Sequence, residues 1–171
     1  NGVPEKVSNV AGLVIGAGGT SRAAIYSLHN LGCSKIFVIN RTVSKSIELR
    51  DSFPQEYNVV AVESTQQIDH LNENIGIAVS CVPADKDLDP ELLAKLERFL
   101  HKGKHNSFVP TLLEAAYKPN VTPVMKLAHD KYQWQVVPGR ELLVHQGVAQ
   151  FEIWTGIKAP FQAIFDTVTR D

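Results

Sequence analysis

The fold follows from residues 13–22, Leu-Val-Ile-Gly-Ala-Gly-Gly-Thr-Ser-Arg, in which an apolar strand leads into a glycine-rich turn. Gly16 lets the chain turn sharply, and Gly18, which has no Cβ, lets the backbone approach a pyrophosphate closely. Apolar residues then recur at helical spacing, so a helix over 20–31 would offer its N-terminal N–H groups to an anion. A tight turn without a ligand is the alternative for a lone glycine motif, but the strand, helix and second strand around it favour phosphate binding.

The end of the second predicted strand indicates which nucleotide binds. NAD sites usually place an acid there to accept a hydrogen bond from the ribose 2′-hydroxyl, and such a carboxylate would repel a 2′-phosphate. This chain has no acid between Asn40 and Ile47, and carries Arg41, Thr42 and Lys45 instead. An arginine meets a phosphate with a fork of donors. A solvated basic helix start is the alternative, but helix starts favour acids. The pattern therefore predicts NADP(H).

The order of apolar segments predicts an α/β fold with a Rossmann-like, doubly wound parallel sheet and helices on both faces. Residue 110 is a proline, so the fifth strand is expected to be irregular or peripheral. The expected strands span 11–15, 35–39, 59–62, 75–79, 107–113 and 133–137, and the expected helices span 20–31, 43–52, 90–100 and 121–130.

Two further helices are predicted beyond those of a minimal Rossmann unit. A helix over 140–154 carries Gln146 and Gln150 near its apolar face, where they either bond to neighbouring backbone or face a polar ligand. A terminal helix within 157–171 has an apolar stripe at helical spacing and is expected to lie exposed without a partner domain. The whole of 1–171 is thus predicted to be one nucleotide-binding domain with this C-terminal helix attached.

Composition narrows the class of protein. The chain has 171 residues, 44% hydrophobic and 20% charged, with a net charge of −1, which gives no reason to expect nucleic-acid binding. No apolar run reaches membrane-spanning length, and no signal peptide opens the chain. Cys33 and Cys81 lack metal-binding spacing, so no metal is expected, and a reducing cytoplasm suits them. Because the chain lacks an initiating Met, we expect a piece of a longer protein.

Four motifs resemble shikimate dehydrogenase. These are Gly-Ala-Gly-Gly-x-x-Arg-Ala at 16–23, Asn-Arg-Thr at 40–42, Tyr-Lys-Pro at 117–119 with Thr-Pro at 122–123, and Gly-x-x-Leu-Leu-Val-x-Gln-Gly-x-x-x-Phe-x-x-Trp-Thr-Gly at 139–156. Residues 80–85 and 108–119 resemble the fungal version, in which this enzyme is the C-terminal part of the pentafunctional AROM polypeptide.

The resemblance implies NADPH-dependent reduction of 3-dehydroshikimate to shikimate, on the route to chorismate and the aromatic amino acids. It also implies an N-terminal substrate domain that supplies the catalytic Lys and Asp and on which the C-terminal helices pack. Those residues would lie upstream of residue 1, so the chain holds no catalytic residue and is expected to be inactive alone. Its implied partners are that domain and the other AROM domains in cis, with dimerisation through other domains left open.

The resemblance also assigns roles to particular residues, according to their positions in the shared motifs. Residues 16–20 (Gly16, Ala17, Gly18, Gly19, Thr20) would hold the pyrophosphate, and Asn40, Arg41, Thr42 and Lys45 the 2′-phosphate. Val82 would lie near the nicotinamide ribose, Ala115 would contact the cofactor, and the Gly139 carbonyl would meet the nicotinamide amide. Tyr117 and Gln146 would reach shikimate, although Tyr117 is alternatively a packed loop aromatic. The chain departs from the family at Glu114, where many bacterial members have Asp, at Leu142 for Met, and at 80–82.

Three alternatives remain open. A quinate/shikimate dehydrogenase working with NAD would usually carry an acid near Asn40. A sensing domain of a fungal quinate repressor would not be an enzyme, and the intact glycine turn, Asn-Arg-Thr and Gln146 favour a working enzyme over it. A Rossmann domain kept only for assembly is the third.

Overall fold

A single parallel sheet organises the computed structural model, which describes residues 10–84, 87–103 and 108–170. Its six strands pair in the order β3-β2-β1-β4-β5-β6, and every pair is parallel. This is the strand order of a Rossmann fold, so the predicted doubly wound α/β architecture is confirmed. The strands are β1 (Ala11–Ile15), β2 (Ile36–Ile39), β3 (Val59–Ala61), β4 (Ile75–Ser80), β5 (Thr111–Glu114) and β6 (Gln135–Val137).

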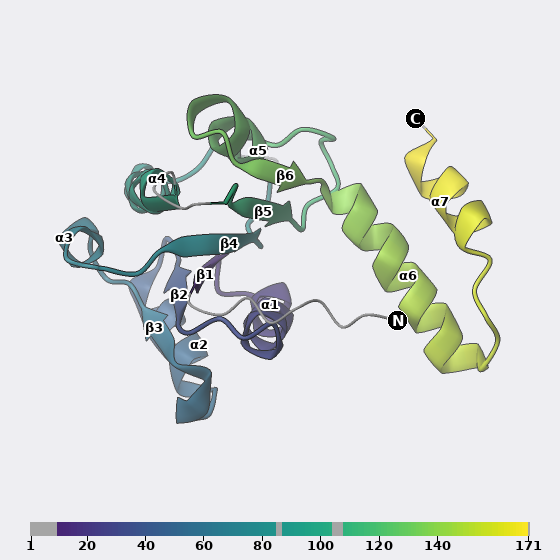
Figure 1. Ribbon diagram of the computed structural model, residues 1–171, viewed down its shortest axis with the longest axis horizontal. Coiled ribbons are helices and arrows are strands. Elements are labelled where there is room, and N and C mark those ends of the chain that lie inside the picture. The colour runs from purple at the N-terminus through teal and green to yellow at the C-terminus, as the bar shows by residue number, and fades with distance from the viewer. Residues whose placement is uncertain (1–9, 85–86, 104–107, 171) are drawn as a thin grey trace.

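Helices cover both faces of the sheet (Figure 1). On one face, α1 (Gly19–Asn30) and α2 (Val43–Asp51) bury Ile25, Leu28 and Leu49 against the sheet. On the other, α3 (Thr65–Asp69), α4 (Pro90–Gly103) and α5 (Pro123–Lys126) enclose a second core. Strand β1 lies between the two, and because successive side chains alternate, Leu13 belongs to one core and Val14 to the other.

The fifth strand differs from what the sequence led us to expect. Strand β5 is neither irregular nor peripheral, because it lies between β4 and β6. Pro110 directly precedes the strand, where its missing N–H breaks no ladder bond, and its carbonyl accepts a hydrogen bond of 2.9 Å from Gln135 N. The expected start of this strand at 107 lies outside the described residues.

Other differences are local. A short helix that was not among the expected helices, α3, lies between β3 and β4, and its first turn is capped by Ser64, which accepts a hydrogen bond of 3.3 Å from Gln67 N. A 3₁₀ turn, η1 (Gln55–Tyr57), precedes β3. The helix expected over 121–130 begins at Pro123 and continues as a π-helical turn, η2 (Leu127–Lys131).

The last two helices, α6 (Gly139–Thr155) and α7 (Phe161–Thr169), lie side by side and away from the sheet (Figure 1). Along α6, Gly139 and Val144 are buried, whereas Ile153 and Trp154 are 79% and 77% exposed. On α7, Phe161 and Phe165 are also exposed, as expected for a stripe without a partner. The expected bounds of α6, 140–154, differ from the observed ones by one residue at each end, and α7 lies within the expected range 157–171.

Candidate nucleotide-binding site

The predicted site residues follow strands at one edge of the sheet. Gly16 follows β1, Asn40 follows β2, Val82 follows β4 and Ala115 follows β5. Because all strands are parallel, their carboxyl ends meet at the same edge. Strands β1 and β4 are neighbours there although their connections run in opposite directions, which makes the crevice between them the expected ligand position of an open α/β sheet.

The glycine turn has the geometry that its sequence predicts. Gly16 has φ of +109°, and a Cβ on it would lie 3.2 Å from the backbone of Cys81, so this position accepts only glycine without strain. A Cβ on Gly18 or Gly19 would meet no atom within 4 Å, which leaves open space above the turn. The N–H of Gly18 donates to the Oγ of buried Ser21 at 3.2 Å, which ties the turn to the first turn of α1. The start of α1, with no acid in its first turn, therefore faces a space that an anion fits.

The end of β2 forms the second wall. Asn40 Nδ2 donates to the carbonyl of Thr42 at 2.9 Å and so shapes the turn into α2. Thr42 is the N-cap of α2, yet its side chain makes no capping hydrogen bond, which leaves the hydroxyl available. Arg41 and Lys45 are exposed beside it, and the first turn of α2 contains no acid. Two cationic side chains and a hydroxyl group therefore line the same pocket.

A pocket of about 560 Å³ joins these two walls. It brings together eight predicted residues: Gly16, Ala17, Gly18, Asn40, Arg41, Thr42, Lys45 and Val82. Six lining residues were not anticipated: Cys81, Pro83, Asp87, Leu88, Asp89 and Leu92. Leu92 lies in the first turn of α4, and the other five come from the segment that connects β4 to α4. The pairing of β4 with β1, which no local sequence pattern reveals, brings this part of the chain to the glycine turn.

Two of the unanticipated lining residues, Asp89 and Cys81, carry polar groups whose surroundings are defined by the structure. The Oδ1 of Asp89 accepts hydrogen bonds from the N–H groups of Glu91 and Leu92 at 3.0 and 3.2 Å, so its carboxylate is engaged at the start of α4. Burial raises the pKa of the Cys81 thiol to about 11, with an opposing contribution from the Ser21 hydroxyl. A pKa of about 11 keeps the Cys81 thiol neutral at neutral pH, and a thiol is a weaker nucleophile than a thiolate.

The other predicted residues lie outside this pocket's lining. Gly19 and Thr20 continue the glycine turn into α1, while Ala115 and Gly139 follow β5 and β6. Gly139 packs so closely on the preceding loop that a Cβ would lie 2.3 Å from the Ala116 carbonyl oxygen. Tyr117 is 48% exposed on that loop, and Gln146 is exposed on α6. The roles predicted for Tyr117 and Gln146 remain predictions.

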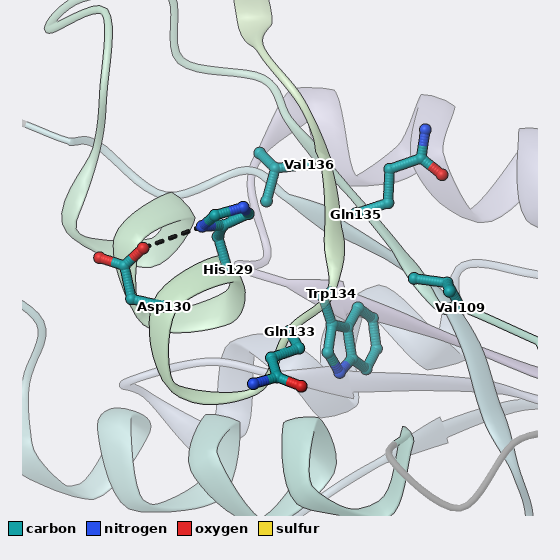
Figure 2. A pocket seen from close by; sticks show the side chains of 7 residues that line it. All are labelled: Val109, His129, Asp130, Gln133, Trp134, Gln135 and Val136. Atoms are coloured by element: carbon teal, nitrogen blue, oxygen red, sulfur yellow. Dashed lines mark hydrogen bonds and ion pairs between the residues drawn. The ribbon is translucent and has the colours of Figure 1, made fainter.

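A larger hollow of about 740 Å³ lies at the opposite, amino edge of β5 and β6 (Figure 2). Its polar groups include the exposed pair of His129 and Asp130, 2.9 Å apart, and the amides of Gln133 and Gln135. Among the described residues that line it there is no glycine, and ligands of open α/β sheets bind at the carboxyl edge. We therefore place nucleotide binding at the smaller pocket.

The described residues also bear on metal sites and membrane spans. They contain no group of three His, Cys, Asp or Glu side chains placed to hold a metal ion. None of their helices combines the length and the apolar character needed to cross a bilayer.

A Rossmann sheet with a phosphate-binding turn and a basic second wall defines a nucleotide-binding domain of the dehydrogenase type. The sequence profile of the family described as shikimate / quinate 5-dehydrogenase matches residues 3–109, and that of the shikimate 5'-dehydrogenase C-terminal domain matches residues 139–168. The chain belongs to the shikimate / quinate 5-dehydrogenase family.

Its relatives include the pentafunctional AROM polypeptides of Zygosaccharomyces rouxii and Saccharomyces cerevisiae, which are 94% and 69% identical to it over all 171 residues. The chain spans 11% of the length of each of these relatives. A solved structure of the dehydroquinate dehydratase and shikimate dehydrogenase from S. pombe AroM is 38% identical, with a TM-score of 0.80 over 96% of this chain and 31% of that one. These similarities do not favour the repressor alternative.

Proposed function

We propose that this chain is the NADP(H)-binding domain of a shikimate 5-dehydrogenase that forms part of an AROM-type multifunctional enzyme. The observation that carries the proposal is the single pocket in which the glycine turn after β1 meets Asn40, Arg41, Thr42 and Lys45 after β2. Family membership and the AROM relatives support it.

In this proposal the chain's residues bind and orient the cofactor. The turn at Gly16–Gly18 and the N–H groups of α1 receive the pyrophosphate, and Arg41 and Lys45 pair with the 2′-phosphate. Val82 and Ala115, at the ends of β4 and β5, direct the nicotinamide toward the cleft. The bound cofactor would supply the hydride that reduces the ketone of 3-dehydroshikimate.

The proton for that reduction would come from outside this chain. The family resemblance places the catalytic Lys and Asp in a substrate domain that precedes residue 1, and assigns Tyr117 and Gln146 to the shikimate side of the cleft. We therefore propose that residues 1–171 form one cofactor domain, that the terminal helix within 157–171 packs on the substrate domain, and that the chain alone has no turnover. Other AROM domains in cis, dimerisation through them and a cytoplasmic location belong to the same proposal.

Calorimetric titration with NADPH and, separately, NADH tests the nucleotide assignment. We expect NADPH to bind clearly and NADH to bind at least about tenfold more weakly, because only NADPH carries the phosphate that Arg41 and Lys45 meet. Equal affinities would contradict the assignment of the second wall. Reduction of 3-dehydroshikimate by the 171-residue chain alone would contradict the assignment of catalysis to an upstream domain.

A further inference from the structure

Glu114 is a buried acid to which no function has been assigned above. It is the last residue of β5 and is 0% exposed. A buried carboxyl is costly unless donors satisfy its oxygens, so its surroundings decide what it does. Burial raises its pKa, and the hydrogen bonds from Ala116 N–H and the Thr122 hydroxyl oppose that rise.

Both oxygens of Glu114 are bound to the loop that follows it. Its Oε1 accepts a hydrogen bond of 3.0 Å from Ala116 N, two residues later. Its Oε2 accepts one of 2.8 Å from the hydroxyl of Thr122, eight residues later. Thr122 is the N-cap of α5, and the same hydroxyl accepts a bond of 3.2 Å from Met125 N. One carboxyl group thus joins the beginning of the loop 115–121 to the helix that ends it.

The rest of the site holds the beginning of this loop from other directions. Ala115 N donates to the Ser80 carbonyl at 2.9 Å, which continues the β4–β5 ladder by one residue. Gly139 packs directly against the Ala116 carbonyl. Between these anchors and Thr122, residues 117–121 are exposed. The far end of the loop is bound through Thr122, so the Glu114 carboxyl links the two ends of the loop.

We propose that Glu114 is a positioning residue, which clamps the loop 115–121 so that Ala115 and Tyr117 face the cleft at a defined height above the sheet. The inference rests on the proposed function, which assigns Ala115 to the cofactor and Tyr117 to shikimate. It adds a residue that touches neither ligand and acts through the loop. The pyrophosphate and 2′-phosphate walls lie on β1 and β2 and do not depend on this clamp.

Two pairs of variants in the full-length polypeptide that carries this chain test the clamp. Glu114→Ala removes both acceptors, whereas Glu114→Asp keeps them. Thr122→Val removes the hydroxyl at constant shape, whereas Thr122→Ser keeps it. We expect kcat for reduction of 3-dehydroshikimate to fall about 10- to 100-fold in the Ala and Val variants, because misplacing a substrate-contacting group by about 1 Å has an effect of that order. The Asp and Ser variants should recover most of that loss.

The affinity for NADPH separates positioning from a general loss of structure. We expect the Kd for NADPH to stay within about threefold of wild type in all four variants, since its charged contacts lie elsewhere. Ser64→Ala is a matched control, because Ser64 caps α3 through a comparable bond of 3.3 Å from Gln67 N but lies outside the site. This variant should keep the wild-type kcat.

Three results would overturn the inference: a wild-type kcat in Glu114→Ala, parallel losses of kcat and NADPH affinity, or an equal loss in Ser64→Ala. If Glu114→Ala does not fold, the Thr122 pair decides, because equal kcat values for the Val and Ser variants contradict the clamp. A wild-type polypeptide with no dehydrogenase activity would contradict the proposed function, whereas an active one that is insensitive to these variants would contradict the clamp alone.

Discussion

Gly103, the last residue of α4, lies against the indole of Trp134, so that a Cβ on Gly103 would be 2.4 Å from Cζ2 of the ring. The ring cannot move aside easily, because Trp134 is 1% exposed and its Nε1 donates to the Leu100 carbonyl at 3.0 Å. This contact fastens the end of α4 to the segment that leads into β6, at the amino edge of the sheet.

Gly103→Ala should therefore destabilise the domain, although alanine favours helices. We expect a loss of about 1–3 kcal/mol in the free energy of unfolding, as for other overpacked cores. Urea denaturation followed by tryptophan fluorescence measures it. Gly147→Ala is the control, because a Cβ there would lie 4.0 Å from Ile164 Cγ2, an ordinary van der Waals contact, and the substitution should be neutral or slightly stabilising. Equal effects of the two substitutions would contradict this packing argument.

Substitutions of Gly16 and Gly18 in the glycine turn should have different effects. Gly16→Ala should lower stability by about 1–3 kcal/mol, because the residue has positive φ and the new Cβ would press on the Cys81 backbone. Gly18→Ala should leave stability nearly unchanged, because Gly18 is extended and its Cβ would enter open space. The same Cβ would occupy the place proposed for the pyrophosphate.

Thermal unfolding and NADPH titration of both variants separate these effects. The Gly18 variant should fold like wild type and bind NADPH at least about tenfold more weakly. Wild-type NADPH affinity in the Gly18 variant would show that the pyrophosphate does not lie above this turn.

Arg41→Ala should weaken NADPH binding and leave NADH binding unchanged. A charge-assisted hydrogen bond to a phosphate contributes about 1.5–3 kcal/mol, so the Kd for NADPH should rise about 10- to 100-fold. Arg50→Ala, in the helix α2 that follows Arg41, removes the same charge from a residue that pairs with Asp51, and it should change neither affinity. A similar loss in both variants would indicate a general electrostatic effect.

The elevated pKa of Glu114 predicts a pH dependence of stability. Burial raises this pKa above its ordinary value of 4.5, so the protonated form favours the folded state. Its stabilising contribution is complete below 4.5 and is lost as the pH rises through the folded-state value. Glu114→Gln removes this titration. Wild type should thus lose stability relative to Glu114→Gln in urea denaturation series from about pH 4 to about pH 8, and a constant difference would contradict the assignment.

The parts predicted from sequence were those that local chemistry controls. The glycine turn depends on backbone sterics, and the strand before it and the helix after it depend on how apolar residues repeat over a few positions. The predicted bounds of that strand and that helix were correct within one residue. The basic turn at 40–42 could be recognised from the sequence because the residues that follow a strand are read directly, and here they include no acid. Strand β5 was misjudged because the effect of Pro110 depends on where the ladder begins, and its neighbours set that point.

By itself, then, the sequence determined the strand-helix alternation, the parallel sheet, the glycine turn and the basic turn on which the proposed nucleotide preference rests. Side-chain period, backbone freedom at glycine and charge at a strand end all act within a few residues. Only the tertiary structure decided that the segment after β4 forms the far wall of the pocket, that Lys95 is 1% exposed on α4, and that the Glu114 carboxyl reaches Thr122. Each of these depends on which strands become neighbours. The strand order depends on the burial of apolar surface over the whole sheet, so no short stretch of the sequence predicts it.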